Sequence, residues 1–148
     1  MAKRLEAVRK RTTDVVADLL AGHRQAALDG PQQARKYLER VLTGQQSLAN
    51  AAKFFAYDLL CDACAHTEAP ERAWEAVEMA RQYVEIAQEE SPREWKDYLG
   101  QIRLYEVGVA LCADDGRFET ALELCEEAIA LGLGRHYEQK AASLRRMT

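Results

Sequence analysis

The chain has 148 residues, enough for one domain with a sizeable hydrophobic core, and no stretch approaches the roughly 20 consecutive apolar residues that cross a membrane. Alanine, leucine, glutamate, glutamine and arginine dominate, and only 3 prolines and 8 glycines occur, so the composition predicts an all-α protein. The formal net charge is −4, and Asp14 and Asp18 interrupt the apolar run that a signal peptide would need after the basic start. We therefore expect a cytoplasmic protein with reduced cysteines and no membrane association.

The charge is unevenly distributed along the chain. Residues 1–12 carry five basic and one acidic side chain, residues 67–131 six basic and sixteen acidic, and residues 132–148 four basic and one acidic. An ordinary solvated helical surface accounts for this pattern. Two other interpretations stay open: the acidic body binds a basic partner, or the basic ends contact an acidic face of a second copy.

Residues 3–28 have the pattern of one long helix, with side chains at spacings of three and four that also suit a coiled-coil seam. This seam consists of Leu5, Val8, Thr12, Val15 and Leu19. Such a helix either packs on the domain or forms an arm that pairs with a second copy in a homodimer. Its basic residues have no interleaved aromatic side chain, so nucleic-acid binding is not expected. They are Lys3, Arg4, Arg9, Lys10 and Arg11.

Further helices follow in chain order. A sharp turn ends the first helix, and residues 31–43 then form a short one. Residues 46–66 form a third helix and residues 70–90 a fourth. A serine three positions before a glutamate, at residues 91–94, is a capping box that predicts a fifth helix over 92–113.

The clearest amphipathic pattern covers residues 115–132, where Asp115 is suited to cap the start of a sixth helix. Its apolar positions are Phe118, Ala121, Leu122, Cys125, Ala128 and Ile129. A seventh helix over 134–147 presents one apolar side and can close the end of a stack. The expected architecture is therefore a single domain of about seven antiparallel helices. Its parts are three hairpins, 1–44, 46–90 and 92–132, and the closing helix 134–147.

The segment 105–131 resembles a tetratricopeptide repeat, whose two helices carry large and small residues at fixed positions around a glycine turn. The matching residues are Tyr105, Val107, Gly108, Leu111, Gly116, Phe118, Ala121, Cys125 and Ala128. The turn is one residue longer than in the family, and the usual closing proline is absent.

Two more degenerate repeats extend the resemblance toward the N-terminus. One contains Tyr57, Leu60, Cys61, Cys64, Ala73, Val77 and Ala80 without a turn glycine, and the other contains Gly22, Ala34, Leu38 and Val41. Ala34, Ala73 and Ala121 are 39 and 48 residues apart, whereas the family repeats about every 34 residues. The resemblance implies a right-handed superhelix of stacked hairpins, and a plain antiparallel bundle is the alternative.

Four cysteines are the main candidates for chemistry. Cys61 and Cys64 lie three apart on one helix face and, with Cys112 and Cys125, could supply four thiolates to zinc. All four occupy inward positions of the repeat pattern, where cysteine packs as a small apolar side chain, so we expect neither metal nor cofactor. No histidine has a nucleophile or acid at a convincing spacing, and we expect no enzymatic activity.

The resemblance also implies a function, because first helices of such repeats line a concave groove that takes a peptide or helix of another protein. The groove candidates are Phe55, Asp58, Asp62, Arg103, Glu106 and Ala110. An aromatic anchor among carboxylates would suit a basic or amphipathic segment, so the expectation is an adaptor, chaperone or regulator. The alternatives are a self-associating helical protein and a zinc or thiol protein.

Overall fold

The computed structural model describes residues 2–44 and 48–147, and it describes side chains from Asp14 onward within these ranges. This part of the chain is all-α, as predicted, with nine α-helices, one short 3₁₀ helix and no strand. The elements are α1 (Ala2–Ala27), α2 (Pro31–Gly44), α3 (Asn50–Ala65), α4 (Pro70–Gln82), α5 (Val84–Glu90), α6 (Pro92–Tyr98), η1 (Leu99–Gln101), α7 (Leu104–Asp114), α8 (Phe118–Ala130) and α9 (Arg135–Met147). No helix within these ranges has the length and apolar character needed to cross a membrane.

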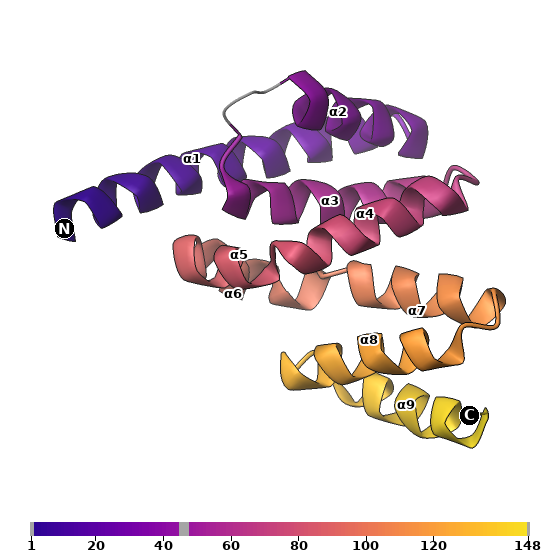
Figure 1. Ribbon diagram of the computed structural model, residues 1–148. Helices are drawn as coiled ribbons and strands as arrows, with labels where there is room; N and C mark the ends of the chain where they lie inside the picture. The colour runs from indigo at the N-terminus through magenta and orange to yellow at the C-terminus, as the bar shows by residue number, and fades with distance from the viewer. Residues whose placement is uncertain (1, 45–47, 148) are drawn as a thin grey trace.

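The helices are stacked one after another from α1 and α2 at one end to α8 and α9 at the other (Figure 1). Each long helix packs mainly against its neighbours in the sequence: α1 on α2, α2 on α3, α3 on α4, α7 on α8 and α8 on α9. α3 also contacts α1 and α7, so these helices form one layer, and α4 packs on α7 across the junction between hairpins. The packed helix pairs are compatible with a helical-repeat fold.

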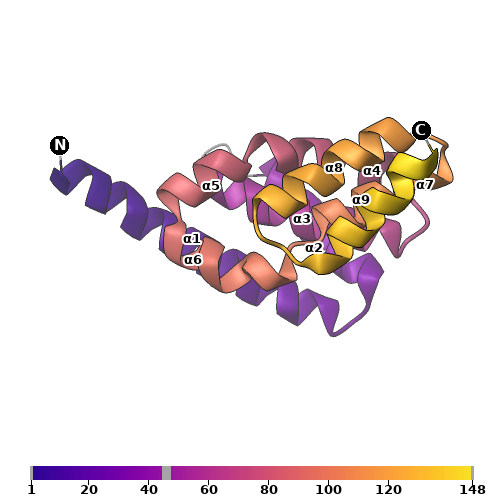
Figure 2. The same cartoon turned by 90° about the horizontal axis from the view of Figure 1, so that it is seen from below.

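Two of the seven predicted helices are each divided in the structure. The predicted helix 70–90 is interrupted at Tyr83, whose φ of −104° and ψ of 4° separate α4 from α5. The predicted helix 92–113 is interrupted at Ile102, which is extended with φ −61° and ψ 127°, between η1 and α7. α5 and α6 therefore pack on each other and form a short insertion between α4 and α7 (Figure 2).

Aromatic side chains hold this insertion against the start of α3. The ring of Trp95 lies 5.1 Å from that of Phe54, and Tyr98 packs edge-on against Phe55 at the same distance. All four side chains are buried, and such pairs add about 1 kcal/mol each beyond the apolar area that they bury. The insertion is thus part of the core.

The α3–α4 and α7–α8 hairpins have the same turn. Arg117 donates its backbone N–H to the carbonyl of Cys112 at 2.8 Å, and Ala69 donates to the carbonyl of Cys64 at 3.0 Å. Each of these hydrogen bonds closes a six-residue Schellman motif. In this motif the residue just past the helix has a left-handed backbone conformation. Gly116 supplies that residue after α7, with φ of 75°, and Glu68 adopts φ of 56° after α3.

The buried alanines of the second helices, α4 and α8, lie 48 residues apart in the sequence, as do the left-handed residues of the two turns. Ala73 and Ala80 of α4 are fully buried, as are Ala121 and Ala128 of α8. The insertion of α5, α6 and η1 between the two hairpins accounts for the long step between these positions.

Glycine allows close contact between helices at the position where the family resemblance requires a small residue. A Cβ on Gly108 of α7 would lie 2.9 Å from Leu124 Cδ1 and 3.0 Å from Val77 Cγ1. α7 therefore approaches α4 and α8 more closely than any larger residue would permit.

The two predicted helix starts at Asp115 and Ser91 have different outcomes in the structure. Asp115 does not cap α8, because α8 begins at Phe118 and Asp115 ends α7 instead. The Ser91 boundary is confirmed, but its hydroxyl donates to the Glu94 carboxylate at 2.6 Å and makes no bond to the backbone N–H groups.

The proposed N-terminal arm falls partly outside what the structure describes. The predicted seam residues Leu5, Val8 and Thr12 and the basic group within residues 3–11 lie where no side chains are described. Farther along α1, Leu19 is buried in the core. Self-association through residues 1–12 therefore stays a prediction.

Candidate functional site

An open cavity of about 340 Å³ lies between α3 and α7 and includes three of the predicted groove residues. Asp62 comes from α3, and Glu106 and Ala110 come from α7. The full lining is Asp62, Ala65, His66, Pro70, Glu106, Val107, Ala110, Leu111 and Asp114. The structure thus brings these three residues together in one cavity, and their role in binding stays a prediction.

A second cavity, of about 200 Å³, continues the first between α7 and α9. The two cavities share Glu106 and Ala110, and α9 contributes His136, Tyr137 and Lys140 to the second. We refer to both together as the groove. It runs across α3, α7 and α9, and its floor contains small and apolar side chains.

Acidic side chains dominate the α3–α7 part of the groove. Asp62, Glu106 and Asp114 line it, and its basic groups are few. Nδ1 of His66 donates to the backbone carbonyl of Asp62 at 2.8 Å, and Arg103 forms an ion pair with Glu106 at 3.2 Å. The C-terminal end of α3 and the N-terminal end of α4, at Pro70, both border this cavity, so their helix dipoles largely offset each other. This part of the groove favours a cationic occupant.

Two predicted groove residues, Phe55 and Asp58, are not at the surface. Both side chains have an exposed fraction of 0%, so neither can contact a partner in this conformation. Phe55 packs in the aromatic cluster with Tyr98. The expectation that they face the groove is wrong because the helix opposite them is broken, and they fill the space at the break.

Asp58 satisfies the backbone at that break. Its carboxylate accepts the N–H of Leu104 at 2.8 Å, the N–H of Arg103 at 3.0 Å and the hydroxyl of Tyr98 at 2.6 Å. The first N–H groups of α7 have no partner within the helix, and no local side chain caps them. Asp58 therefore acts as a cap supplied from α3, 45 residues earlier in the sequence.

Burial changes the acidity of this group. It raises the pKa of Asp58 to about 6, and the hydrogen bonds from Tyr98, Leu104 and Arg103 act against the rise. The pKa of Tyr98 lies well above its ordinary value because of burial and the neighbouring carboxylate. The Asp58–Tyr98 pair thus couples α3, α6 and α7 within the core.

The four cysteines lie where the repeat pattern places them. Cys61, Cys64, Cys112 and Cys125 are all buried and all free. Burial raises the pKa of each thiol, and Cys61 donates its S–H to the carbonyl of Asp58 at 3.0 Å. Among the described residues no group of three or more histidine, cysteine, aspartate or glutamate side chains could hold a metal ion.

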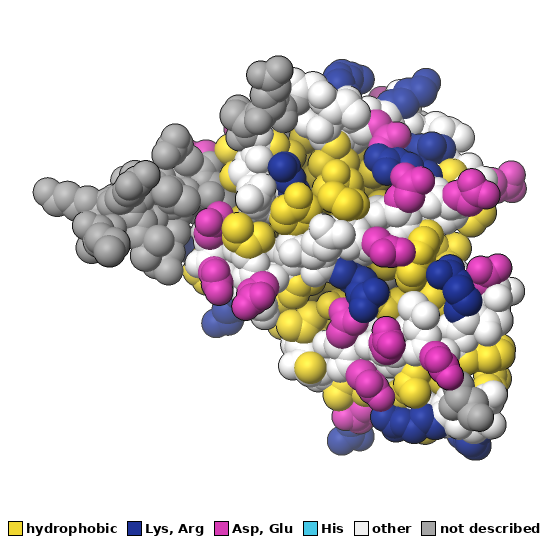
Figure 3. Space-filling view, in the orientation of Figure 1, with side chains coloured by type: hydrophobic (Ala, Val, Ile, Leu, Met, Phe, Trp, Pro, Cys, Tyr) yellow, Lys and Arg dark blue, Asp and Glu magenta, His cyan; other side chains and the backbone are white. Residues whose placement is uncertain are grey.

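The side of the molecule formed by α2, α4 and α8, away from the groove, carries ion pairs between neighbouring helices. Arg72 of α4 donates from Nε to Glu39 of α2 at 3.0 Å, and Arg81 of α4 donates from Nε to Glu127 of α8 at 3.2 Å. Acidic and basic side chains are interspersed on the face seen in Figure 3, and no histidine is visible on it. Two ion pairs on this face join α4 to neighbouring helices.

Comparison of the chain with protein-family models, with curated proteins and with solved structures found no match. The resemblance to tetratricopeptide repeats therefore depends on the residues named above and on the paired helices.

Proposed function

We propose that the protein is a non-enzymatic binding module that holds a basic or amphipathic segment of another protein in the groove. The observation that supports this proposal is the groove itself, which crosses three helices and combines an apolar floor with carboxylates on the α3–α7 side. A helix or extended peptide suits such a surface, because apolar side chains fill the floor and charged ones reach the rim.

The resemblance to tetratricopeptide repeats supports the same role. First helices of such repeats line the binding face. Here α3 and α7 are the first helices of two hairpins whose turns have the same geometry. We place the protein among adaptors, chaperones or regulators on this ground.

A defined peptide library tests the proposal. Helix-forming peptides of about 12 residues, roughly 18 Å long when helical, are displayed and selected on the purified protein. We expect the selected peptides to carry lysine or arginine on one side and small or apolar residues on the other. Because screening weakens exposed charge pairs, we expect their affinity to fall as the salt concentration rises.

Charge-reversal variants then locate the binding surface. The double variant Asp62→Lys, Glu106→Lys should weaken binding of the selected peptides by about tenfold or more. The control double variant Glu85→Lys, Glu89→Lys makes the same charge change on exposed positions of α5 and should have little effect. Equal loss in both variants would show general charge attraction, and no loss in either would contradict binding in the groove.

A further inference from the structure

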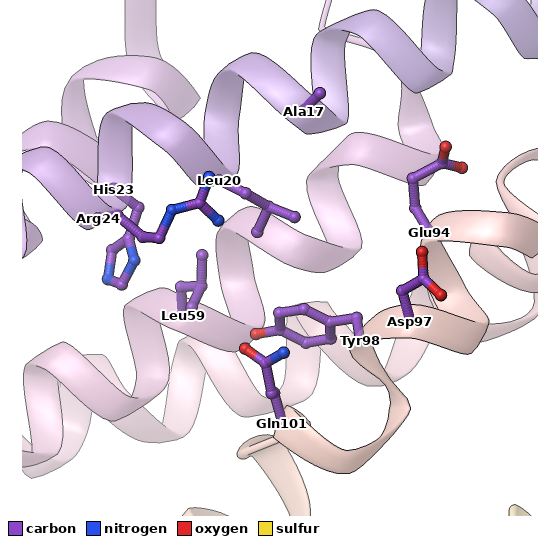
Figure 4. A pocket seen from close by; sticks show the side chains of 9 residues that line it. All are labelled: Ala17, Leu20, His23, Arg24, Leu59, Glu94, Asp97, Tyr98 and Gln101. Atoms are coloured by element: carbon purple, nitrogen blue, oxygen red, sulfur yellow. The ribbon is translucent and has the colours of Figure 1, made fainter.

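A third open cavity, about 440 Å³ in volume, lies between α1, α3 and α6 (Figure 4). We call it the α1–α6 hollow. Leu20 of α1, Leu59 of α3 and the ring of Tyr98 provide its apolar surface. Its complete lining is Ala17, Leu20, His23, Arg24, Leu59, Glu94, Asp97, Tyr98 and Gln101. The hollow can therefore bury an apolar side chain.

Opposite charges face each other across the hollow. Figure 4 shows His23 and Arg24 on the α1 side and Glu94 and Asp97 on the α6 side. Burial lowers the pKa of His23 from its ordinary value of 6.5, so this imidazole is mostly neutral near pH 7. Arg24 is then the cation of one wall, and the carboxylates of Glu94 and Asp97 are the anions of the other.

Glu94 accepts a hydrogen bond from the hydroxyl of Ser91, whereas Arg24 and Asp97 differ from the charged residues of the opposite face. There, Arg72 and Arg81 reach across to glutamates on neighbouring helices. In the hollow, neither Arg24 nor Asp97 lies within 4 Å of an oppositely charged partner among residues 14–44 and 48–147, although the two stand on facing walls. An occupant with both signs of charge could pair with both.

The hollow is next to the groove along α3. Leu59 lines the hollow, and Asp62, one helical turn later, lines the groove. The charge of Asp62 acts on His23 on one side and on Arg103 on the other. One bound segment can therefore pass from the groove over Asp62 to the hollow.

We infer that the partner segment held in the groove continues into the α1–α6 hollow, where it places an apolar side chain between an acidic residue that pairs with Arg24 and a basic residue that pairs with Asp97. This inference rests on the proposed function and adds a second recognition element to it. The occupant is one segment of a protein partner, and the part of it that enters the hollow carries one acidic and one basic residue.

Extended peptides provide the test. A groove-binding peptide from the selection described above is lengthened by about eight random residues at each end, roughly 12 Å if helical, and the library is selected again on the full chain. We expect one end to become enriched in an apolar residue with an acidic and a basic neighbour. The dissociation constant should fall by about tenfold relative to the short peptide, from apolar burial and two charge pairs.

Variants show whether the higher affinity of the extended peptide comes from contacts in the hollow. Arg24→Glu and Asp97→Lys should each remove most of the gain while leaving the affinity for the short peptide unchanged. Exchanging the acidic residue of the peptide for lysine should restore binding to Arg24→Glu. The control variants Arg40→Glu on α2 and Glu89→Lys on α5 change exposed positions outside the hollow and should keep the gain.

Two negative results have different meanings. If short peptides bind in the groove but extension gives no gain, or the gain survives Arg24→Glu and Asp97→Lys, the inference is overturned and the proposed function stands. If no short peptide binds in the groove, the proposed function and this inference fail together.

Discussion

At the scale of single residues, Asp58 has the largest structural role among the polar side chains. It is fully buried in α3, yet it accepts hydrogen bonds from the start of α7 and from Tyr98. A carboxylate in this place needs all of these donors, because a buried charge without partners is strongly unfavourable. The donors equally need the carboxylate.

Removing this carboxylate should therefore destabilise the fold. We expect Asp58→Ala to lower the free energy of unfolding by about 3 kcal/mol, because Tyr98 and the N–H groups of Arg103 and Leu104 lose their acceptor. Asp62→Ala is the matched control, since its side chain is 37% exposed, and it should change stability by less than about 1 kcal/mol. Urea unfolding measures both, and equal effects would show that Asp58 is not a required cap.

The raised pKa of Asp58 gives stability a specific pH dependence. With a pKa of about 6 in the folded state and 3.8 as its ordinary value, the folded protein binds a proton at this site where the unfolded chain does not. The contribution of Asp58 to stability therefore rises as pH falls through 6, by an amount on the order of 3 kcal/mol, and levels off near pH 4.

Comparison with an isosteric variant isolates this effect. The difference in unfolding free energy between the native protein and Asp58→Asn should grow in favour of the native protein from about pH 7 to about pH 4. A difference that is constant or shrinks over this range would contradict the raised pKa. The carboxyl carbon resonance of Asp58 should titrate with a midpoint of about 6.

This role of Asp58 could not be predicted from the amino-acid sequence. In a helical pattern a single aspartate is normally solvated, and its partners lie 40 to 46 residues away. Gly100 was the one local sign that the helix over 92–113 could break, since glycine lowers helix propensity. Asp62, Glu106 and Ala110 line one cavity, as helical spacing alone indicates.

At the scale of helices and turns, spacing and turn residues predicted most elements. The starts of α2, α4 and α6 at prolines follow from local chemistry, because proline suits the first helical turn. The interruption at Tyr83 has no local sign, and Gly100 is only a weak one for the interruption at Ile102. The apolar pattern continues through both, and the packing of α5 and α6 on α3 decides them.

The turn after α3 offers a test of the repeated hairpin. Glu68 occupies the left-handed position that Gly116 fills in the equivalent turn, and a side chain there costs about 1 kcal/mol. We expect Glu68→Gly to raise the free energy of unfolding by about 0.5–1 kcal/mol. Glu71→Gly, three residues later in the first turn of α4, should lower it by a similar amount. Loss of stability in Glu68→Gly would contradict the turn geometry.

The close packing of α7 gives a second test at this scale. We expect Gly108→Val to lower the free energy of unfolding by about 2 kcal/mol, because the new side chain would overlap Leu124 and Val77. Gly100→Val introduces the same residue where nothing lies within 4 Å, and its effect should stay below about 1 kcal/mol. Thermal or urea unfolding of the pair compares them, and a tolerated Gly108→Val would mean that α4, α7 and α8 are less tightly packed.

At the scale of the whole molecule, the two sides differ in their ion pairs and cavities. On one side ion pairs join α4 to α2 and to α8. On the other, α1, α3, α7 and α9 border open cavities, and every histidine of the chain lines one of them. We therefore propose that partners bind on the side of α1, α3, α7 and α9.

Nuclear magnetic resonance mapping with a selected basic peptide tests this assignment most directly. Amide resonances of groove residues, in particular Asp62, His66, Ala110 and Asp114, should shift on binding, while those of Glu78 and Glu123 on α4 and α8 should not. We expect the largest shifts along α3, α7 and α9. Largest shifts along α2, α4 and α8 would contradict it.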